Sequence, residues 1–231
     1  MTEETRAGSF LSALAAAEQD KFRRLGRHRE LRRGDTLFHE GDPSDFVALI
    51  LRGNVKVSSV ADSGVETLLA TRGPGDIIGE MAAVDGELRS ADVSALDTVQ
   101  FRIIPARDFF RFLEEHPSAT RALLALCTAR LRDADRKRAE VRGLDVLRRL
   151  TRRLLELSQT HGRQTSAGIV LDIPLSQQEL AEWIGASREA VAKALRILRQ
   201  RGALATQRRA LTILDPELLR RLVEPRDGRR D

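Results

Sequence analysis

The hydrophobic periodicity of the chain changes several times, and each change marks a different kind of element. Residues 9–25 repeat apolar positions at helical spacing, whereas residues 31–105 break into short apolar or alternating runs divided by turn residues. Phe46–Leu51 is such a run, Gly53-Asn54 is a tight turn, and residues 91–104 read as two strands divided near Leu96-Asp97. This pattern predicts a helix followed by a closed or nearly closed antiparallel β domain.

Residues 117–144 form one long helical pattern with a narrow apolar stripe. The stripe has heptad-like spacing and consists of Leu124, Cys127, Leu131, Ala134 and Val141. So narrow a stripe favours helix pairing between two subunits, although packing against the β domain is an alternative, and both can hold on different faces. Gly143-Leu144-Asp145 ends the pattern and predicts a hinge.

The remaining chain alternates short helical and strand-like patterns. Residues 146–158 are amphipathic, residues 159–168 are polar and predicted to be a loop, and residues 169–171 form a short strand. Two further runs, 203–206 and 211–214, predict a hairpin with Gln207-Arg208-Arg209 at its tip, followed by a last helix from Pro216 to Val223. A basic hairpin tip of this kind is suited to phosphate contact.

Between these segments, residues 176–201 predict two short helices joined by a sharp turn. Ser176 and Glu179 form a capping box, Gly185 suits the left-handed end of the first helix, and Ser187 caps the second. The second helix has a buried stripe and an opposite polar face, of which Arg188, Glu189 and Lys193 are members. This arrangement is typical of a helix-turn-helix, and we interpret Trp183 on its first helix as a packing residue.

The charge is unevenly distributed between the two halves of the chain. Residues 146–231 carry 17 Lys and Arg against 10 Asp and Glu, a net charge of +7, whereas residues 1–145 carry 22 against 24. Charge alone is equally compatible with a solvated basic surface. Together with the helix-turn-helix pattern, however, it indicates a nucleic-acid partner.

Composition excludes several other classes. No apolar run approaches the roughly 20 residues of a membrane span, and the acidic N-terminus lacks the features of a signal peptide, so we expect a cytoplasmic protein without membrane contact. The single cysteine and the four scattered histidines offer no cluster for a metal or an iron–sulfur centre. No nucleophile–base set appears, so we do not expect an enzyme.

Residues 79–91, here called the cassette, have the chemistry to bind a phosphate ester of a sugar. Gly79 permits close backbone approach, and one helical turn over residues 81–84 would direct free N–H groups at an anion. Arg89 and Ser90 supply a charge and a hydroxyl, while Glu80 can accept hydrogen bonds from ribose hydroxyls. The alternative is that Glu80 and Arg89 pair across an ordinary loop.

From about Leu25 to Thr212 the chain resembles the CRP/FNR superfamily, the relatives of the bacterial cyclic-AMP receptor protein. The resemblance rests on motifs in the family order, namely Phe38-His39-Glu40-Gly41-Asp42, Leu51-Arg52-Gly53, Gly79-Glu80 with Arg89-Ser90-Ala91, and Gly185-Ala186-Ser187-Arg188-Glu189 with Lys193. It implies an α+β fold: a β-roll sensor domain with an N-terminal helix at 1–116, a dimerisation helix and hinge at 117–145, and a winged helix-turn-helix at 146–231.

The resemblance also implies a homodimeric transcription regulator that binds double-stranded DNA. Arg188, Glu189 and Lys193 would read bases in a palindrome with TGTGA-like half-sites. Five residues would contact the DNA backbone: Ser176, Gln178, Ser187, Arg208 and Arg209. RNA polymerase is an expected partner, with residues 159–168 as its candidate contact by family position.

The implied effector is cyclic AMP or another cyclic nucleotide or dinucleotide. The residues implied in its binding are Gly79, Glu80, Met81, Ala82, Arg89, Ser90, Ala91, Ala134 and Asp135. Ala134 and Asp135 stand where cyclic-AMP-responsive members offer Thr and Ser or Asn to the adenine. Three alternatives follow: an altered response to cyclic AMP, a different nucleotide, or a pocket that no longer signals in a constitutive DNA-binding regulator. The cysteine set of the iron–sulfur members is absent.

Overall fold

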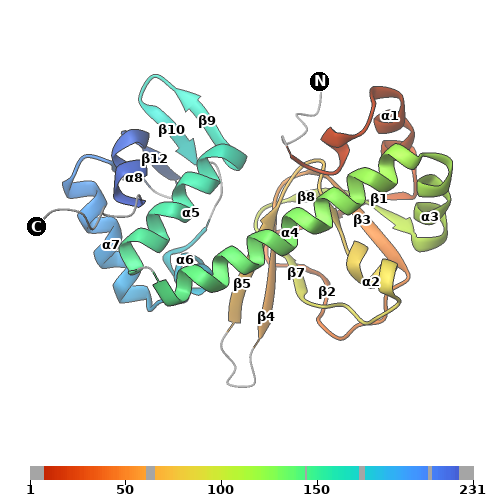
Figure 1. Cartoon of the computed structure of the whole chain (residues 1–231), viewed down its shortest axis with the longest axis horizontal. Helices are drawn as coiled ribbons and strands as arrows, with labels where there is room; N and C mark the ends of the chain where they lie inside the picture. Colours follow the sequence, from red (N-terminus) through yellow and green to blue (C-terminus); the bar gives the residue numbers. More distant parts are fainter. Residues whose placement is uncertain (1–7, 61–65, 144, 172–174, 208–209, 224–231) are drawn as a thin grey trace, which may run out of the picture. The chain divides into compact units, whose positions relative to one another are not determined.

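The computed structural model of the chain describes residues 8–60, 66–143, 145–171, 175–207 and 210–223, without the side chains of 139–143, 207 and 210. The chain forms two compact units, residues 1–135 and 136–231. Their boundary falls inside helix α4 (Pro117–Gly143), which contributes to both units (Figure 1). The finer division expected from the sequence, at 116/117 and 145/146, stays a prediction.

Within its described residues, the first unit contains two antiparallel sheets of four strands each. The first has the order β1 (Arg27–Leu31), β8 (Val99–Pro105), β3 (Phe46–Arg52), β6 (Ile77–Ile78). The second has the order β2 (Thr36–Phe38), β7 (Asp92–Ala95), β4 (Val55–Val60), β5 (Glu66–Arg72). The predicted antiparallel β domain is therefore confirmed, as is the division of residues 91–104 into two strands.

Strand β3 explains how this unit is held together. Its residues alternate between two clusters: Val47 and Leu49 pack with the helices, whereas Ala48 and Ile50 pack with residues of the second sheet. All four are fully buried, which accounts for the uninterrupted apolar run in the sequence. The helices involved are α1 (Ala16–Arg24), α3 (Ala106–Glu115) and the start of α4, preceded by the 3-10 turn η1 (Leu11–Ala13).

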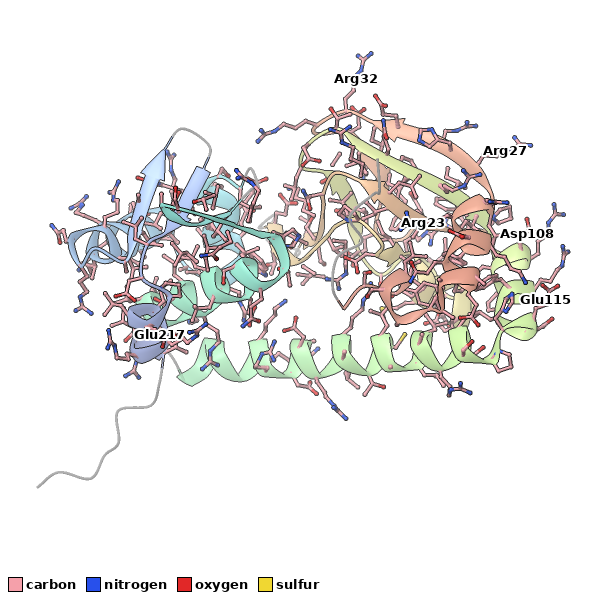
Figure 2. All side chains as sticks on the ribbon, turned by 90° about the horizontal axis from the view of Figure 1, so that it is seen from above. Arg23, Arg27, Arg32, Asp108, Glu115 and Glu217 are labelled. Carbon is pink, nitrogen blue, oxygen red and sulfur yellow. The ribbon has the colours of Figure 1, made fainter. Side chains whose placement is uncertain are left out.

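Strand β1 lies at the edge of its sheet and pairs with β8 in the register Arg27↔Ile103 to Leu31↔Val99. Its residues 27–30 are exposed, and Arg27 points away from the sheet (Figure 2). Charged side chains on an edge strand disfavour unwanted pairing with another chain. The strand region thus begins at Arg27, four residues before the sequence pattern indicated.

In the described residues of the second unit, three helices and a small sheet pack around helix α5 (Val146–His161). The three helices are α6 (Gln177–Ile184), α7 (Arg188–Gln200) and α8 (Pro216–Val223). The sheet has the order β11 (Leu204–Gln207), β12 (Ala210–Ile213), β10 (Gly168–Leu171), β9 (Gly162–Thr165). Asp145 accepts a hydrogen bond from the backbone N–H of Arg148 (2.8 Å) and so caps α5 directly after the predicted hinge.

The predicted loop at 159–168 is wrong. Helix α5 continues to His161, and β9 pairs with β10 from Gly162↔Leu171 to Thr165↔Gly168. The side chains of β9 are polar and mostly exposed, so the strand has no hydrophobic pattern. Its pairing is made by backbone N–H and C=O groups, which every residue except proline supplies in full. In the described part of the chain, no helix is both long and apolar enough to cross a bilayer.

Candidate functional site

The cassette begins where β6 ends, at a glycine in a left-handed conformation. Gly79 has φ +79° and forms the N-cap of α2 (Glu80–Asp85), which ends at Gly86, also left-handed at φ +75°. The helical turn expected at 81–84 is therefore present. Glu80 and Ala82 face the interior of the unit, whereas Met81 and Val84 are more than half exposed.

Arg89 closes the other end of the cassette from a buried position. Its guanidinium donates hydrogen bonds to the carbonyl oxygens of Gly79 (3.0 Å) and Phe46 (2.8 Å). The same group lies 4.2 Å from the ring centre of Phe38 and 4.5 Å from that of Phe46. A Cβ atom on residue 79 would lie 2.2 Å from Nη1 of Arg89, so this approach requires glycine.

Burial of Arg89 lowers the pKa of its guanidinium, and the nearby carboxylates of Asp45, Asp42 and Glu80 oppose this shift. Among the described residues, the buried Nε of Arg89 has no hydrogen-bond partner. Buried polar atoms are normally satisfied, so this donor is suited to an acceptor that the chain itself does not supply. The cassette therefore fits an anionic ligand, with α2 and Ser90, which is exposed, beside the arginine.

Glu80 does not pair with Arg89 but with Arg130 of α4, which overturns the loop-pairing alternative. A guanidinium N–H of Arg130 donates to Oε1 of Glu80, and its Nη2 donates to the carbonyl oxygen of Ile77 (3.0 Å). The Glu80 side chain is 3% exposed and that of Arg130 is 18% exposed. No local pattern in the sequence indicated Arg130, because its partner Glu80 is fifty residues away along the chain.

The base-recognition positions also lie on α4. Ala134 follows Arg130 by one helical turn on the same face and is half-buried, whereas Asp135 is exposed. Ala91, at the end of the cassette, is buried. The described contacts join α4 to the cassette through Arg130, and the assignment of Ala134 and Asp135 to the base stays a prediction.

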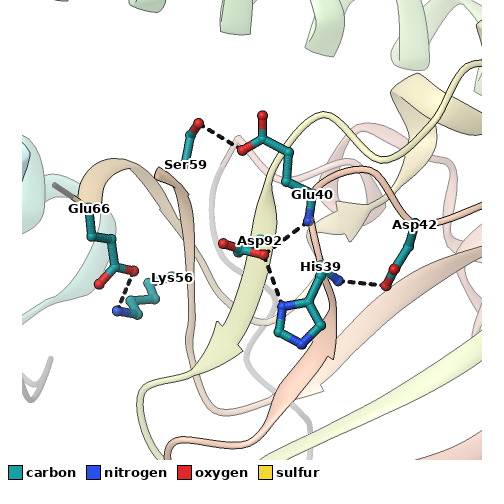
Figure 3. A network of polar contacts seen from close by, with 7 residues as sticks. All are labelled: His39, Glu40, Asp42, Lys56, Ser59, Glu66 and Asp92. Atoms are coloured by element: carbon teal, nitrogen blue, oxygen red, sulfur yellow. Dashed lines mark hydrogen bonds and ion pairs between the residues drawn. The ribbon is translucent and has the colours of Figure 1, made fainter. Parts of the chain in front are cut away.

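A polar network fixes the loop that holds Arg89 (Figure 3). The carboxylate of Asp92 accepts a hydrogen bond from the backbone N–H of Glu40 (2.9 Å) and lies 3.1 Å from Nδ1 of His39. The Glu40 carboxylate in turn accepts from the Ser59 hydroxyl (2.8 Å). Asp42 caps the turn by accepting from the N–H of His39 (2.8 Å).

This loop binds the backbone of Arg89 directly. The Arg89 N–H donates to the carbonyl of Asp42 (2.9 Å), and the Gly41 N–H donates to the carbonyl of Arg89 (2.8 Å). The run from Phe38 to Asp42 thus has a physical role, since it places one ring and two backbone groups around the arginine. Sequence reasoning identified the run as a landmark and missed this role, together with Asp92.

A separate cavity of about 550 Å³ lies elsewhere in the first unit. It is lined by Gly26, Arg27, Arg29, Ile103, Pro105, Arg107 and Asp108. None of the residues predicted to bind a nucleotide is among them. Among the described residues, no group of three or more His, Cys, Asp or Glu is arranged to hold a metal ion.

The apolar stripe of α4 is divided between two environments. Leu124 and Leu131 are 63% and 62% exposed, as expected of residues that await a partner helix. Cys127 is half-buried and packs against the core of its own unit, where burial and the nearby Glu80 raise the pKa of its thiol. The side chain of Val141 lies outside the described residues. The dimer interface thus stays a prediction, with the two leucines as its exposed members.

The helix-turn-helix has the predicted caps. Ser176 accepts from the N–H of Glu179 (3.1 Å), whose carboxylate accepts from the N–H of Ser176 (2.7 Å). Gly185 ends α6 at φ +60°, and Ser187 accepts from the N–H of Ala190 (3.2 Å) to start α7. These local contacts fix the turn between the two helices.

Helix α7 presents its predicted base-reading residues to solvent. Arg188, Glu189 and Lys193 are exposed, while the opposite stripe of Val191, Ala194, Leu195 and Leu198 is buried. The pKa of Glu189 is lowered by its hydrogen bonds to its own backbone N–H and to the Ser187 hydroxyl. Glu189 is therefore ionised at neutral pH, as an acceptor for a cytosine amino group must be.

The predicted DNA-backbone residues are only partly described. Ser176, Gln178 and Ser187 are exposed at the starts of α6 and α7. Gln178 donates a hydrogen bond to Glu182 one turn later (2.8 Å). Arg208 and Arg209 lie outside the described residues, between β11 and β12.

Comparison with known proteins agrees with both halves of this description. Residues 28–116 match the cyclic nucleotide-binding domain family, and residues 148–222 match the Crp-like helix-turn-helix domain family. A CRP-like cAMP-activated global transcriptional regulator of Mycobacterium tuberculosis is 34% identical over 82% of this chain and 84% of its own length. A global nitrogen regulator of Synechococcus elongatus is 29% identical over 86% of this chain and 93% of its own.

The solved structures show the same fold. FixK2 from Bradyrhizobium japonicum superposes with a TM-score of 0.77 at 20% identity, covering 87% of this chain and 98% of its own. The relatives are transcription regulators and not enzymes. With a match to the cyclic nucleotide-binding domain family, a Crp-like helix-turn-helix and a relative of this similarity, the chain belongs to the CRP/FNR family of DNA-binding transcription regulators.

Proposed function

We propose that the chain is a homodimeric, sequence-specific regulator whose DNA affinity responds to a small ligand in the cassette, a cyclic nucleotide or a related compound. The observation that carries this proposal is the hydrogen bond from Arg130 of α4 to the buried carboxylate of Glu80. A ligand hydroxyl that approached Glu80 would compete with or reinforce this bond. Ligand binding would then act directly on α4, the helix that carries the dimer stripe.

The chemistry of the cassette supports an anionic sugar ligand. Arg89 offers a buried N–H donor, α2 offers its first N–H groups behind Gly79, and Glu80 offers a carboxylate for ribose hydroxyls. The M. tuberculosis relative is described as cAMP-activated, which favours cyclic AMP as the first ligand to test. A population shift requires that the ligand bind one arrangement of α4 more tightly than the other.

A second candidate is a constitutive DNA-binding regulator with an altered pocket. It is favoured by the two hydrogen bonds that already engage Arg89 with Phe46 and Gly79, and by its 2% exposure. Ala134 adds to this candidate, since its side chain has no polar group to recognise a base. On this alternative, the cassette would stabilise the fold and not signal.

The proposed DNA complex is a palindrome with TGTGA-like half-sites, read once by each protomer. Arg188 suits the two acceptors of guanine, Glu189 the cytosine amino group, and Lys193 a further guanine. The exposed Leu124 and Leu131 support pairing of α4 with α4 of a second copy. RNA polymerase as a partner and a cytoplasmic location belong to this proposal, since the matched regulators are bacterial.

Calorimetry on the full chain tests the ligand. Cyclic AMP, cyclic GMP and cyclic di-GMP are each titrated, and the affinity for a fluorescent TGTGA palindrome is then measured with and without each compound. Binding of one compound with a changed DNA affinity is the expected result. High DNA affinity without binding of any compound would instead establish the constitutive regulator. A duplex with scrambled half-sites controls for non-specific binding, and light scattering measures the oligomeric state.

A further inference from the structure

The only tryptophan of the chain marks a contact between α4 and the helix-turn-helix. Trp183 lies near the end of α6, and the Nζ atom of Lys137 on α4 lies 5.8 Å from the centre of its ring. Both residues belong to the second unit. In the described part of the chain, the buried indole N–H has no hydrogen-bond partner, so it is the face of the ring that makes this polar contact.

A contact from the other side of the hinge reaches the same end of α6. Arg149 lies in the first turns of α5, and its Nη2 donates to the carbonyl oxygen of Gly185 (3.2 Å). Gly185 is the left-handed residue in the turn between α6 and α7. The end of α6 is therefore contacted by one residue that precedes the predicted hinge and by one that follows it.

The two helices that flank the hinge also contact each other. Nη2 of Arg136 on α4 lies 3.4 Å from Oε1 of Glu156 on α5. A change in the angle between α4 and α5 would alter this ion pair, and it would also move Lys137 relative to Arg149. The end of α6 would then be displaced or lose its contact with Lys137 or with Arg149.

We propose that Lys137 and Trp183 are positioning residues for DNA reading, which pass the angle between α4 and α5 to the recognition helix. Ser187, the N-cap of α7, follows Gly185 by two residues, and the predicted base readers Arg188 and Glu189 come next. A displacement at the Trp183–Gly185 end of α6 therefore reaches the base readers through a rigid, capped turn. The inference rests on the proposed function, because it assigns the route by which a ligand at the cassette would affect DNA affinity.

A double-mutant cycle without ligand is the first test. The affinity for the palindromic duplex is measured for the parent, Lys137→Met, Trp183→Phe and the double variant, with Lys21→Met as the matched control on an exposed position of α1. We expect Lys137→Met to change the affinity about two- to fivefold in the parent and much less in the Trp183→Phe background, because a phenyl ring attracts a cation less than an indole does. Lys137→Arg, which keeps the cation, restores the parent value.

The fluorescence of Trp183 is the second test, because no other tryptophan contributes to it. Saturating cyclic AMP changes the emission of the parent and of Lys21→Met, and changes that of Lys137→Met less. Circular dichroism melting shows whether each variant is folded. Additive effects in the cycle, or a Lys137→Met variant equal to Lys21→Met in both affinity and emission, would overturn the positioning role.

The outcomes separate the two proposals. A parent that binds DNA while calorimetry shows no ligand contradicts the ligand switch alone, and the cycle still decides on Lys137. A parent that binds no duplex contradicts the proposed function, and this inference fails with it. A parent that responds to cyclic AMP while Lys137→Met responds equally overturns only the route through Trp183.

Discussion

The carboxylate of Glu80 accepts a hydrogen bond from the guanidinium of Arg130, fifty residues further along the chain. Glu80 begins the short helix of the cassette, and Arg130 lies on the long helix that carries the apolar stripe. Arg130 also donates a hydrogen bond to the carbonyl oxygen of Ile77, the first residue of β6. One side chain of α4 thus contacts both the strand before the cassette and the first residue of its helix.

Replacement of Arg130 by Met should destabilise the first unit strongly. The buried Glu80 carboxylate would lose its charged partner, and breaking a buried pair from one side costs about 3–5 kcal/mol. We expect a loss at the lower end of this range, because Arg130 is 18% exposed. Urea unfolding at neutral pH measures it, with Arg132→Met on an exposed position of the same helix as the control. Equal stability of the two variants would contradict the role given to the pair.

Replacement of Arg89 by Lys should separate the structural role of the cassette from ligand binding. Lysine keeps the charge but loses the fork that reaches both Phe46 and Gly79, so we expect about 2–3 kcal/mol lower stability and weaker nucleotide binding. The neighbouring Ser90→Ala, at an exposed position, should weaken binding alone. Calorimetric titration and urea unfolding of both variants check this. The prediction fails if Arg89→Lys unfolds like the parent.

Glu18 should make the first unit sensitive to acid. Hydrogen bonds from the Ser118 hydroxyl and the Ala15 N–H lower the pKa of its carboxyl group, with a smaller contribution from His116. A lowered folded-state pKa stabilises the fold fully above the unfolded value, about 4.3, and this stabilisation is lost as the pH falls through the folded value.

The measurement is the unfolding midpoint from about pH 5 down to about pH 3, the range in which a glutamate with a lowered pKa takes up its proton. The parent should lose stability over this range more steeply than Glu18→Gln. Glu115→Gln, on an exposed position of α3, is the control and should follow the parent (Figure 2). Parallel curves for all three proteins would show that Glu18 does not contribute.

Replacement of Arg188 or Glu189 by Gln should relax the preference for one base pair in each half-site. A bidentate or charged contact to a base edge discriminates by about 1–3 kcal/mol, so selectivity at that position should fall by that amount. Competition binding with single-base variants of the palindrome measures it. Arg196→Gln, exposed further along α7, should leave the preferred sequence unchanged. A variant of Arg188 or Glu189 with unaltered selectivity would exclude that residue as a base reader.

Replacement of Arg208 and Arg209 by Gln should weaken binding to all duplexes alike. Phosphate contacts carry no sequence information, and each one lost lowers the dependence of log K on log salt by about one. Titrations of specific and scrambled duplexes over a range of salt concentrations measure both effects. Selective loss of the specific complex would contradict a backbone role for the hairpin tip.

Local chemistry made the helix-turn-helix predictable. Ser176, Glu179, Gly185 and Ser187 specify their caps and turn within a few residues of themselves, and the structure has each of these contacts. The continuous apolar run of β3 was equally informative, because burial on both faces leaves no polar alternation. The caps, the turn and the buried strand depend on residues that are neighbours in sequence, so the sequence alone is enough to predict them.

Long-range pairing was not predictable. Arg130 for Glu80 and Asp92 for His39 join positions that only the assembled sheets and helices bring together. The prediction of a loop at the polar strand β9 was wrong for another reason, since the pairing of this strand depends on backbone groups and not on side chains. The alternative in which Glu80 pairs with Arg89 considered only residues close in sequence. It therefore left out Arg130, which α4 brings to Glu80.

Gly79 is restricted twice over, by its left-handed backbone and by the guanidinium that occupies the space of a side chain. Only the first restriction is a property of residue 79 itself. The second disappears in any descendant that replaces Arg89, after which asparagine, which tolerates the left-handed region, becomes admissible at 79. Asparagine at position 79 is therefore expected to destabilise the fold less in a background where Arg89 has been replaced by a shorter side chain than in the parent.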